Sequence, residues 1–337
     1  MKKGTTCIGW MAALTLLLFM GNLFIGSVDI PYGSVWQILT GSGEERASWQ
    51  FIVLDSRLPQ ALTALFCGAA LSVSGLMLQT VFRNPLAGPS ILGIDSGASL
   101  GVALVMLFSG GSMLAGDIHF SGFLAVTLAA FVGALFVMGL LLFFSTLLRS
   151  DVMLLIVGVM IGYLTSSVIS LLNFFATSEG VHSYLIWGMG SFGGVSMEQM
   201  PWFAALVVSG ICVALLLVKP LNALLLGRYY AENLGVNVRC TRYLLLFTTG
   251  LLSAATTAFC GPVSFLGLAV PHIARLILGR ADHRLLMPLT LLTGSAVALL
   301  CNSLCVLPGD RGIIPLAAVT PLLGAPVILY VLLKGKR

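Results

Sequence analysis

Hydrophobic residues occur along this chain in long runs, which short polar or Gly/Pro-containing segments separate. A run of about 20 apolar residues can cross the ~30 Å hydrocarbon core of a bilayer as a helix. With turn and charge signals marking the ends, the pattern predicts an all-α polytopic membrane protein that forms one domain over residues 1–337. The ten predicted spans are 8–28, 58–81, 91–109, 121–148, 152–175, 201–218, 243–261, 265–279, 286–306 and 316–333.

Composition supports a membrane protein. Hydrophobic residues make up 58% of the 337 residues, charged residues 9%, and the mean hydropathy is +1.05. A soluble domain carries about 25% charged residues, so this chain lacks the polar residues to cover a water-facing surface. We therefore expect lipid and protein partners, and no nucleic acid despite a net charge of +5.

The first apolar run has two interpretations, a cleaved signal peptide or a retained helix. The run from Cys7 to Val28 is longer than the hydrophobic region of a signal peptide, and no A-x-A-like site follows it. A retained first span is the better interpretation. With ten spans, the two termini lie on the same side.

Basic residues decide the orientation, because cytoplasmic loops carry an excess of Lys and Arg. If the N-terminus is cytoplasmic, 14 of the 17 basic residues fall on the inner side, and only Arg46, Arg57 and Arg311 fall outside. Both termini and the segment 221–242 are then predicted to be cytoplasmic.

Acidic residues are nearly absent from the predicted spans. Of the 12 acidic residues, only Asp95 falls within a membrane-depth segment. Ion-coupled carriers usually bind their coupling ion through such residues. An ion-driven carrier or channel therefore remains only an alternative, and a transporter with this sequence would take its energy from another subunit.

Motifs for catalysis or metal binding are missing. No G-x-x-x-x-G-K-[ST] loop and no H-E-x-x-H pattern occurs. Cys301 and Cys305 share a helix face at i, i+4, which would suit a metal, although a buried cysteine usually acts as a small hydrophobe. We expect no catalytic residue, no metal site and no cofactor bound by this chain.

A third hypothesis is an intramembrane serine hydrolase, because Ser72, Ser74 and His272 lie at or near membrane depth. Serine in a membrane helix is mostly a packing or hydrogen-bonding residue. Glycine is abundant as well, with 38 residues clustered in GAALSVSG (68–75), GIDSGASLG (93–101) and GMGSFGG (188–194). These small residues predict closely packed helices.

The polar segment LNALLLGRYYAENLGV (221–236) interrupts the apolar runs. Helix formers divided by Gly227 and Gly235 predict two short helices that end in left-handed caps. Leu224, Leu225, Tyr229 and Leu234 would form one apolar flank. A helix lying on the membrane surface would be longer and richer in lysine, so a rigid protrusion that fits a partner's groove is favoured.

Four blocks in order resemble the FecCD-type permease subunits of ABC importers, which take up siderophores, haem and vitamin B12. The blocks are RLPQALTALFCGAALSVSGLMLQTVFRNPLAGPSILGIDSGASLG (57–101), LNALLLGRYYAENLGV (221–236), GPVSFLGLAVPHIARLILGRADHRLLMP (261–288) and TPLLGAPVILYVLL (320–333). The resemblance covers essentially the whole chain and implies the type II importer fold with ten helices. It implies a homodimer in the bacterial inner membrane, two ABC ATPase subunits that carry ATP and Mg, and a periplasmic binding protein.

The resemblance also assigns roles to single positions. The ATPase-coupling residues would be Leu221, Asn222, Leu224, Gly227, Ala231, Leu234 and Gly235; the docking residues for the binding protein would be Arg57 and, as a substitute, Arg311; the cytoplasmic gate residues would be Asn84, Leu86, Ser150 and Asp151. Asn84 would otherwise be a turn former before Pro85, and Asp151 a favourable charge at a helix start.

Three positions depart from the family pattern. Gln60 replaces the second arginine of the family's RLPR pattern. Val306 replaces the docking arginine of the second half, and Ile313 begins the stretch that is normally glutamate–leucine–proline. These departures concern the docking electrostatics and not the architecture. The stretch GMGSFGGVSM (188–197) is reminiscent of vitamin B12 permeases and favours cobalamin slightly over iron-siderophore or haem.

Overall fold

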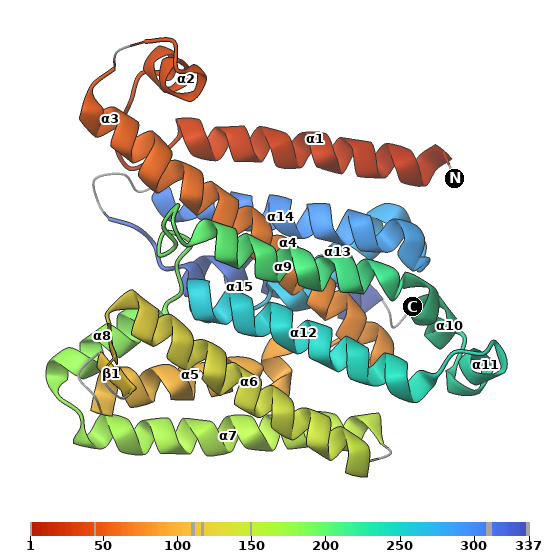
Figure 1. The fold of residues 1–337 in the computed structure, drawn as a ribbon. Coiled ribbons are helices and arrows are strands. Elements are labelled where there is room, and N and C mark those ends of the chain that lie inside the picture. Colours follow the sequence, from red (N-terminus) through yellow and green to blue (C-terminus); the bar gives the residue numbers. More distant parts are fainter. Residues whose placement is uncertain are drawn as a thin grey trace.

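The computed structural model describes residues 2–43, 45–108, 112–115, 118–148, 150–307 and 312–334. These residues form a bundle of helices with one short antiparallel hairpin (Figure 1). The elements of the first half are α1 (Lys2–Phe24), α2 (Tyr32–Thr40), α3 (Ala47–Phe51), η1 (Ile52–Arg57), α4 (Leu58–Val81), η2 (Pro89–Leu92), α5 (Ile94–Ala103), η3 (Leu104–Phe108), β1 (Ser112–Ala115), β2 (Ile118–Ser121) and α6 (Phe123–Leu147). Those of the second half are α7 (Asp151–Phe175), α8 (Ser178–Gly188), α9 (Met200–Leu216), α10 (Val218–Leu225), α11 (Arg228–Asn233), α12 (Val238–Cys260), α13 (Leu266–Leu278), α14 (His283–Val306) and α15 (Leu316–Lys334).

The predicted all-α membrane fold is confirmed. The ten predicted spans correspond to α1, α4, α5 with η3, α6, α7, α9, α12, α13, α14 and α15. Within the described residues, six helices are long and apolar enough to cross a membrane, or seven if α9 and α10, which meet at 50°, form one span. The helices at 94–107, 266–278 and 316–331 are shorter.

The second span differs most from its prediction. Instead of beginning at residue 58, helix continues through α3, η1 and α4 over 35 residues, Ala47–Val81. At 1.5 Å per residue this rod is about 50 Å long, well beyond the ~30 Å hydrocarbon core. Its first turns therefore extend out of the bundle toward α2, as Figure 1 shows.

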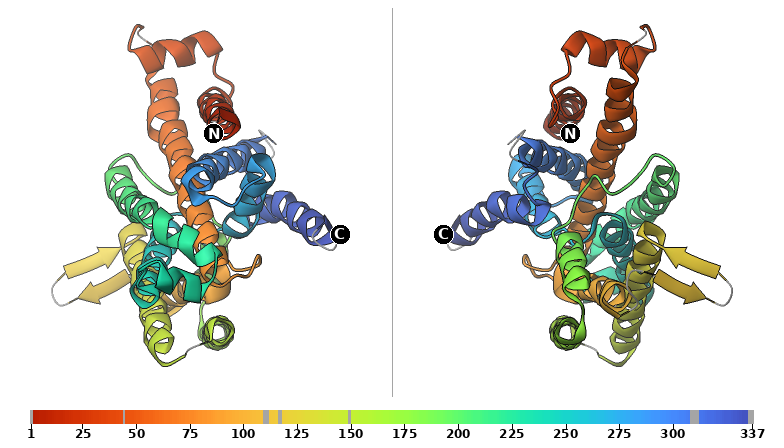
Figure 2. Two further views of the ribbon diagram at one scale, coloured as in Figure 1. Left: turned by 90° about the vertical axis from the view of Figure 1, so that its right-hand side faces the viewer. Right: turned by 90° about the vertical axis from the view of Figure 1, so that its left-hand side faces the viewer.

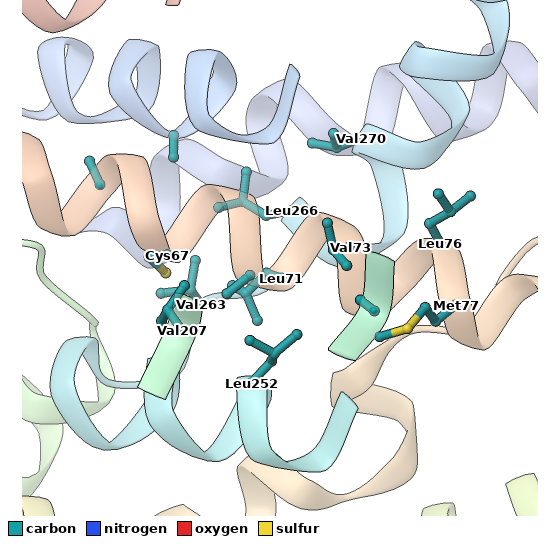
Figure 3. Close-up of a cluster of buried hydrophobic side chains, with 14 of the residues drawn as sticks. Cys67, Leu71, Val73, Leu76, Met77, Val207, Leu252, Val263, Leu266 and Val270 are labelled. Carbon is teal, nitrogen blue, oxygen red and sulfur yellow. The ribbon is translucent and has the colours of Figure 1, made fainter. Parts of the chain in front are cut away.

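The rod also forms the centre of the core. Its α4 part packs against α14, α12, α13 and α9. Figure 3 shows α4 side chains meeting those of these neighbours: Cys67, Leu71, Val73, Leu76 and Met77 from α4, Val207 from α9, Leu252 from α12, and Leu266 and Val270 from α13. Burial on all sides explains why α4 carries no charged residue.

Glycines allow the helices of this core to approach closely. A methyl group on Gly75 would overlap the carbonyl oxygen of Gly267 in α13, and one on Gly68 would overlap the carbonyl oxygen of Gly294 in α14. In the second cluster, a methyl group on Gly97 would lie 2.5 Å from the Gly133 oxygen in α6. The close packing that the sequence predicts for these two clusters is confirmed.

The bundle has two distinct ends. Figure 1 shows the start of α1, the end of α15 and the pair α10–α11 toward one end, which we call the inner end. It shows α2, α8 and the β hairpin toward the opposite end, which we call the outer end. Figure 2 views the bundle from each end and shows the hairpin projecting from its side.

Candidate functional site: the inner end and its surroundings

The predicted protrusion consists of α10 and α11. Gly235 ends α11 at φ +80°, with hydrogen bonds from its own N to Glu232 O at 2.9 Å and from Val236 N to Ala231 O at 3.0 Å. This is the predicted left-handed cap. Gly227 differs, because its φ of +121° and ψ of 156° lie in a positive-φ region that glycine adopts but outside the left-handed helical one. It begins α11 instead of capping α10.

The base of the protrusion is fixed in the core. Leu221 and Ala231 are fully buried, and Leu224 is 9% exposed. The predicted apolar flank is therefore divided, because Leu225 and Tyr229 remain 45% and 84% exposed. The apolar residues that stay exposed on the protrusion are Leu225, Leu226, Tyr229, Tyr230 and Leu234, which we call the tip. A buried base under an exposed apolar tip suits a partner surface.

Asn222 joins this base to α14. Its Nδ2 donates to Asp282 Oδ1 at 2.7 Å, and its Oδ1 accepts from His283 N at 2.8 Å. His283 Nε2 in turn lies 2.9 Å from Thr80 Oγ1 in α4. The pKa of Asp282 is lowered, first by the hydrogen bond from Arg284 N and then by the Asn222 amide. The Asn222 contacts place α10, α14 and α4 in one polar network.

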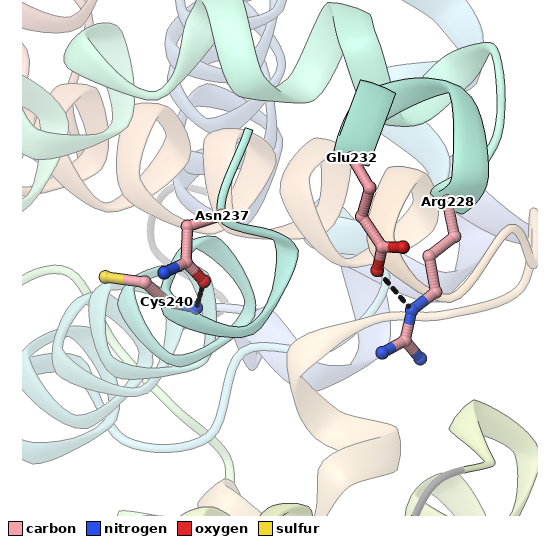
Figure 4. A network of polar contacts seen from close by, with 4 residues as sticks. All are labelled: Arg228, Glu232, Asn237 and Cys240. Atoms are coloured by element: carbon pink, nitrogen blue, oxygen red, sulfur yellow. Dashed lines mark hydrogen bonds and ion pairs between the residues drawn. The ribbon is translucent and has the colours of Figure 1, made fainter. Parts of the chain in front are cut away.

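Local bonds stiffen the protrusion and the turn that follows. Arg228 Nε forms an ion pair with Glu232 Oε1 at 3.1 Å, one helical turn later (Figure 4). Asn237 Oδ1 accepts from Cys240 N at 3.0 Å and so caps the start of α12. The exposed ion pair adds little energy, but both contacts define the geometry of the segment.

The loop after α4 contains the predicted gate residues Asn84 and Leu86. Asn84 Oδ1 accepts from Leu86 N at 2.9 Å, the bond of an Asx turn, and Leu86 is 38% exposed. His272 Nε2 lies 2.8 Å from Pro85 O and ties the loop to α13. The turn-forming interpretation of Asn84 is thus visible, while the gate role stays a prediction.

The same helix α13 holds α4 through a second polar contact, which the sequence did not suggest. Arg275 Nη1 donates to Gln79 Oε1 at 2.6 Å, and Gln79 Nε2 donates to Leu268 O at 3.1 Å. Through these bonds α13 is attached to the end of α4, and through the His272 contact it is attached to the loop at 82–93.

The second predicted gate pair lies at the start of α7. Ser150 Oγ accepts from Met153 N at 3.4 Å and is the N-cap. Asp151 is the first residue of α7, where a negative charge is favourable. These positions agree with helix-start roles, and a gate role remains a prediction.

Arg57 is not exposed as a docking residue would be. It is 5% exposed, and its Nη1 donates to Leu23 O at 3.1 Å and Phe24 O at 3.0 Å, while Nη2 donates to Val28 O. The guanidinium therefore caps the C-terminal end of α1. A salt bridge to a binding protein would require it to leave these carbonyls. Arg311 lies outside the described residues.

Gln60, at one of the unusual positions, has an internal partner. Its Nε2 donates to Asn302 Oδ1 at 3.0 Å, and Asn302 Nδ2 donates to Asn22 Oδ1 at 2.8 Å. This amide ladder joins α4, α14 and α1. Gln60 therefore links α4 to α14 inside the bundle.

Asp95, the acid at membrane depth, is held by hydroxyl groups. Its Oδ1 accepts from Ser253 Oγ at 3.0 Å and from Thr257 Oγ1 at 2.9 Å, both in α12. The residues of the hydrolase hypothesis do not pair: Ser72 Oγ donates to backbone carbonyls, and His272 bonds Pro85 O. Among the described residues, no group of three or more His, Cys, Asp or Glu could hold a metal ion; Cys301 and Cys305 are buried in the core.

The glycine-rich stretch at 188–194 lies against the turn between α12 and α13. Ser191 N donates to Cys260 O at 2.8 Å, and a methyl group on Gly190 would lie 2.9 Å from Pro262 O. Phe192 is only 2% exposed. This stretch therefore has a packing role in the described chain.

Helix α2 was missed, although the sequence contains its signals. Pro31 precedes it, and Gly41 ends it at φ +65°, which is the usual asymmetry of helix ends. Val35 and Ile38 pack with Val53 of η1 in a small separate core. The apolar period was too short to stand out beside the long spans.

Comparison with known proteins agrees with this architecture. The family model described as the FecCD transport family matches residues 14–334. The chain belongs to the FecCD transport family. Members are membrane permeases of ABC transporters, and this chain is a multi-pass transport subunit of that kind.

Individual relatives cover nearly the whole chain. The vitamin B12 import system permease protein BtuC of Klebsiella pneumoniae subsp. pneumoniae is 35% identical over 330 residues, which are 97% of this chain and 94% of the relative. The BtuC of Salmonella typhi is 35% identical over 332 residues, 98% and 96% of the two chains. A solved metal-chelate type ABC transporter in an inward-facing conformation is 28% identical, with a TM-score of 0.84 over 98% of this chain and 99% of the other.

Proposed function

We propose that this chain is the permease of an ATP-driven importer that takes up a bulky metal chelate, with cobalamin as the first candidate. The vitamin B12 permeases among its relatives support cobalamin, and the metal-chelate type transporter supports the wider substrate class. Iron-siderophore and haem remain the alternatives within that class. ATP and Mg are bound by the partner ATPase, and this chain binds no cofactor.

The observation that carries the proposal is the protrusion with its fixed base and exposed tip. Of the seven predicted coupling residues, Leu234 belongs to the tip, and Gly227 and Gly235 lie at the two ends of α11. Leu221, Leu224 and Ala231 belong to the buried base, and Asn222 forms the polar network with α14. A base so connected would transmit a displacement of the tip to α14 and α4. We assign the tip to an ABC ATPase subunit.

The remaining parts of the assembly follow from the same proposal. Two copies of the chain form a homodimer around a central pathway, with an ATPase subunit on each copy. Helix α7 is our candidate for the surface that contacts the second copy, because its side chains Leu164 and Phe174 are 70% and 80% exposed. Asn84, Leu86, Ser150 and Asp151 would close the pathway at the inner end, which faces the cytoplasm together with both termini. The protein then lies in the bacterial inner membrane.

The outer end would receive a periplasmic binding protein. Because Arg57 is occupied by the end of α1, its docking role would require a rearrangement of that contact. Tyr32 and Trp36 on α2, 70% and 56% exposed, offer an additional contact surface there. Arg311 remains the proposed second docking charge.

The first experiment is the native mass of the tagged protein, gently extracted from its own host's membranes. Two copies of this chain with two ATPase subunits are expected. The variant Tyr229→Ser in the tip should lose the ATPase subunits, whereas Tyr32→Ser, at a similarly exposed tyrosine of the outer end, should keep them. A homodimer that never carries an ATPase, even after crosslinking, would exclude the proposal.

The substrate requires a separate measurement. The complex and its binding protein, reconstituted in liposomes with ATP inside, should accumulate labelled cobalamin in preference to ferric siderophore or haem. Uptake of one of the other chelates alone would keep the importer and correct its substrate. ATP-independent uptake driven by an ion gradient would support the ion-driven alternative instead.

A further inference from the structure

A cavity of about 410 Å³ lies at the inner end, between the protrusion and the ends of α4, α6 and α12. Its wall is rich in arginine and hydroxyl groups: Arg83, Arg228, Arg239, Arg242, Thr80, Ser145, Thr146 and Tyr243. No acidic side chain lines it within the described residues, and the nearby Glu232 is paired with Arg228. We call it the basic cavity, and its arginine-rich wall favours an anionic ligand.

An apolar groove adjoins the basic cavity. It has a volume of about 500 Å³ and lies between α6 and α12, lined by Leu142, Phe143, Thr146, Cys240, Tyr243, Leu244 and Phe247. Thr146 and Tyr243 belong to both hollows. Phe143 and Phe247 are 58% and 47% exposed. The cationic and the apolar hollow therefore meet at Thr146 and Tyr243.

The position of the site relative to the bilayer defines the kind of ligand. Ser145 and Thr146 lie in the last turn of α6, and Arg239 and Arg242 lie in the first turns of α12. Both helices are candidate membrane spans, so we place the arginines at headgroup level, where Arg and Tyr are common anchors. The groove then extends from this level along the membrane-spanning parts of the two helices.

We propose that the basic cavity and the groove bind an anionic phospholipid of the inner-end leaflet. The phosphate lies among the arginines, and one acyl chain lies along Phe143 and Phe247. Basic pockets between membrane helices bind such headgroups. Ser145 is one of the cavity residues, and its Oγ is buried without a hydrogen-bond partner among the described residues.

An acidic segment of an ATPase fits the site less well. Such a segment could reach the arginines, but a water-soluble protein does not fill an apolar groove at membrane depth. The cavity also reaches the protrusion, because Arg228 belongs to α11 and Arg83 Nη2 lies 3.4 Å from Leu224 O. A bound headgroup would therefore contact the base of the protrusion.

The test uses the full-length permease, delipidated in detergent and titrated with phosphatidylglycerol while native mass spectrometry counts bound lipid. The double variant Arg239→Gln/Arg242→Gln should bind about 25-fold more weakly, since each cation near a membrane surface contributes about fivefold. The matched control, Arg280→Gln/Arg284→Gln, removes two exposed inner-end charges outside the cavity. It should bind as the unmodified chain does.

The groove has its own pair of variants. Phe143→Ser should weaken phosphatidylglycerol about tenfold, while Phe136→Ser, a 64% exposed phenylalanine elsewhere on α6, should not change it. Phosphatidylcholine and inorganic phosphate serve as probes of the separate parts, and both should bind far more weakly. Thermal melting of each variant checks that it is folded.

Several results would overturn the proposal. Equal phosphatidylglycerol binding by the Arg239/Arg242 double variant would mean ordinary annular lipid. Inorganic phosphate binding as tightly as the lipid, without an effect of Phe143→Ser, would mean a free-anion site. Loss of the lipid when the ATPase assembles would mean that an acidic segment of the ATPase occupies the arginines.

Discussion

The amide nitrogen of Asn222 lies 2.7 Å from the carboxylate oxygen of Asp282, and the same amide accepts the backbone N–H of His283. One side chain of α10 thus forms hydrogen bonds with polar groups at the start of α14. Because His283 is only 1% exposed, the loss of these bonds leaves buried polar groups without partners. The connection between protrusion and bundle depends on this amide as well as on apolar packing.

Replacing Asn222 should therefore weaken the connection between the protrusion and the start of α14. Asn222→Leu removes the hydrogen bonds to Asp282 Oδ1 and to the N and Nδ1 of His283 and should cost about 1–3 kcal/mol of stability, with a further loss of ATP-driven uptake. Asn233→Leu, an exposed change in α11, is the matched control and should leave stability unchanged. Thermal melting and uptake in liposomes measure the two effects. Equal behaviour of the two variants would refute the role of Asn222.

The glycine contact between α4 and α13 should tolerate no side chain. In Gly75→Ala the new methyl group meets the backbone oxygen of Gly267, and backbone cannot move aside as a side chain can. We expect a loss above the usual ~1–3 kcal/mol of overpacking and little folded protein by size-exclusion chromatography. Gly139→Ala, in α6 where no atom lies within 4 Å, should behave as the unmodified chain.

The amide ladder should contribute measurable coupling. Gln60 and Asn302 bond within the bundle, where polar contacts between membrane helices contribute about 0.6 kcal/mol on average and up to ~1.7. A double-mutant cycle of Gln60→Met and Asn302→Leu should give a coupling energy in this range. Additive effects would mean that the bond contributes nothing beyond packing.

A substitution at Asp95 should distinguish an ATP-driven importer from an ion-driven carrier. Asp95→Asn keeps the shape of the side chain and the acceptor oxygen that Ser253 and Thr257 reach, but it removes the ionisable group. An ATP-driven importer should keep its uptake rate within about twofold, because ions play no part in its energy source. Uptake that needs an ion gradient and disappears in Asp95→Asn would point to a coupled carrier.

Features that follow from the pattern along the chain were predictable from the sequence, whereas contacts between distant segments were not. The ten spans and the protrusion at 221–235 follow from hydrophobic length, glycine position and charge. The burial of Arg57 does not follow, since its carbonyl partners belong to residues 23–28, more than 25 positions away. The contact between Gln79 and Arg275, 196 positions apart, and the clustering of arginines around the basic cavity likewise depend on how distant helices meet.

The rod from Ala47 to Val81 has a mechanical consequence. A helix of about 50 Å, packed on several sides along its α4 part, connects the two ends of the bundle, and its π-helical part η1 (Ile52–Arg57) is where it would bend most easily. A tilt of about 5° around its middle would displace both ends by roughly 2 Å in opposite directions. One end carries the surface around α2, and the other leads directly into Arg83 and the loop of Asn84 and Leu86. A displacement at the outer end would therefore reach the inner loops through one continuous helical segment.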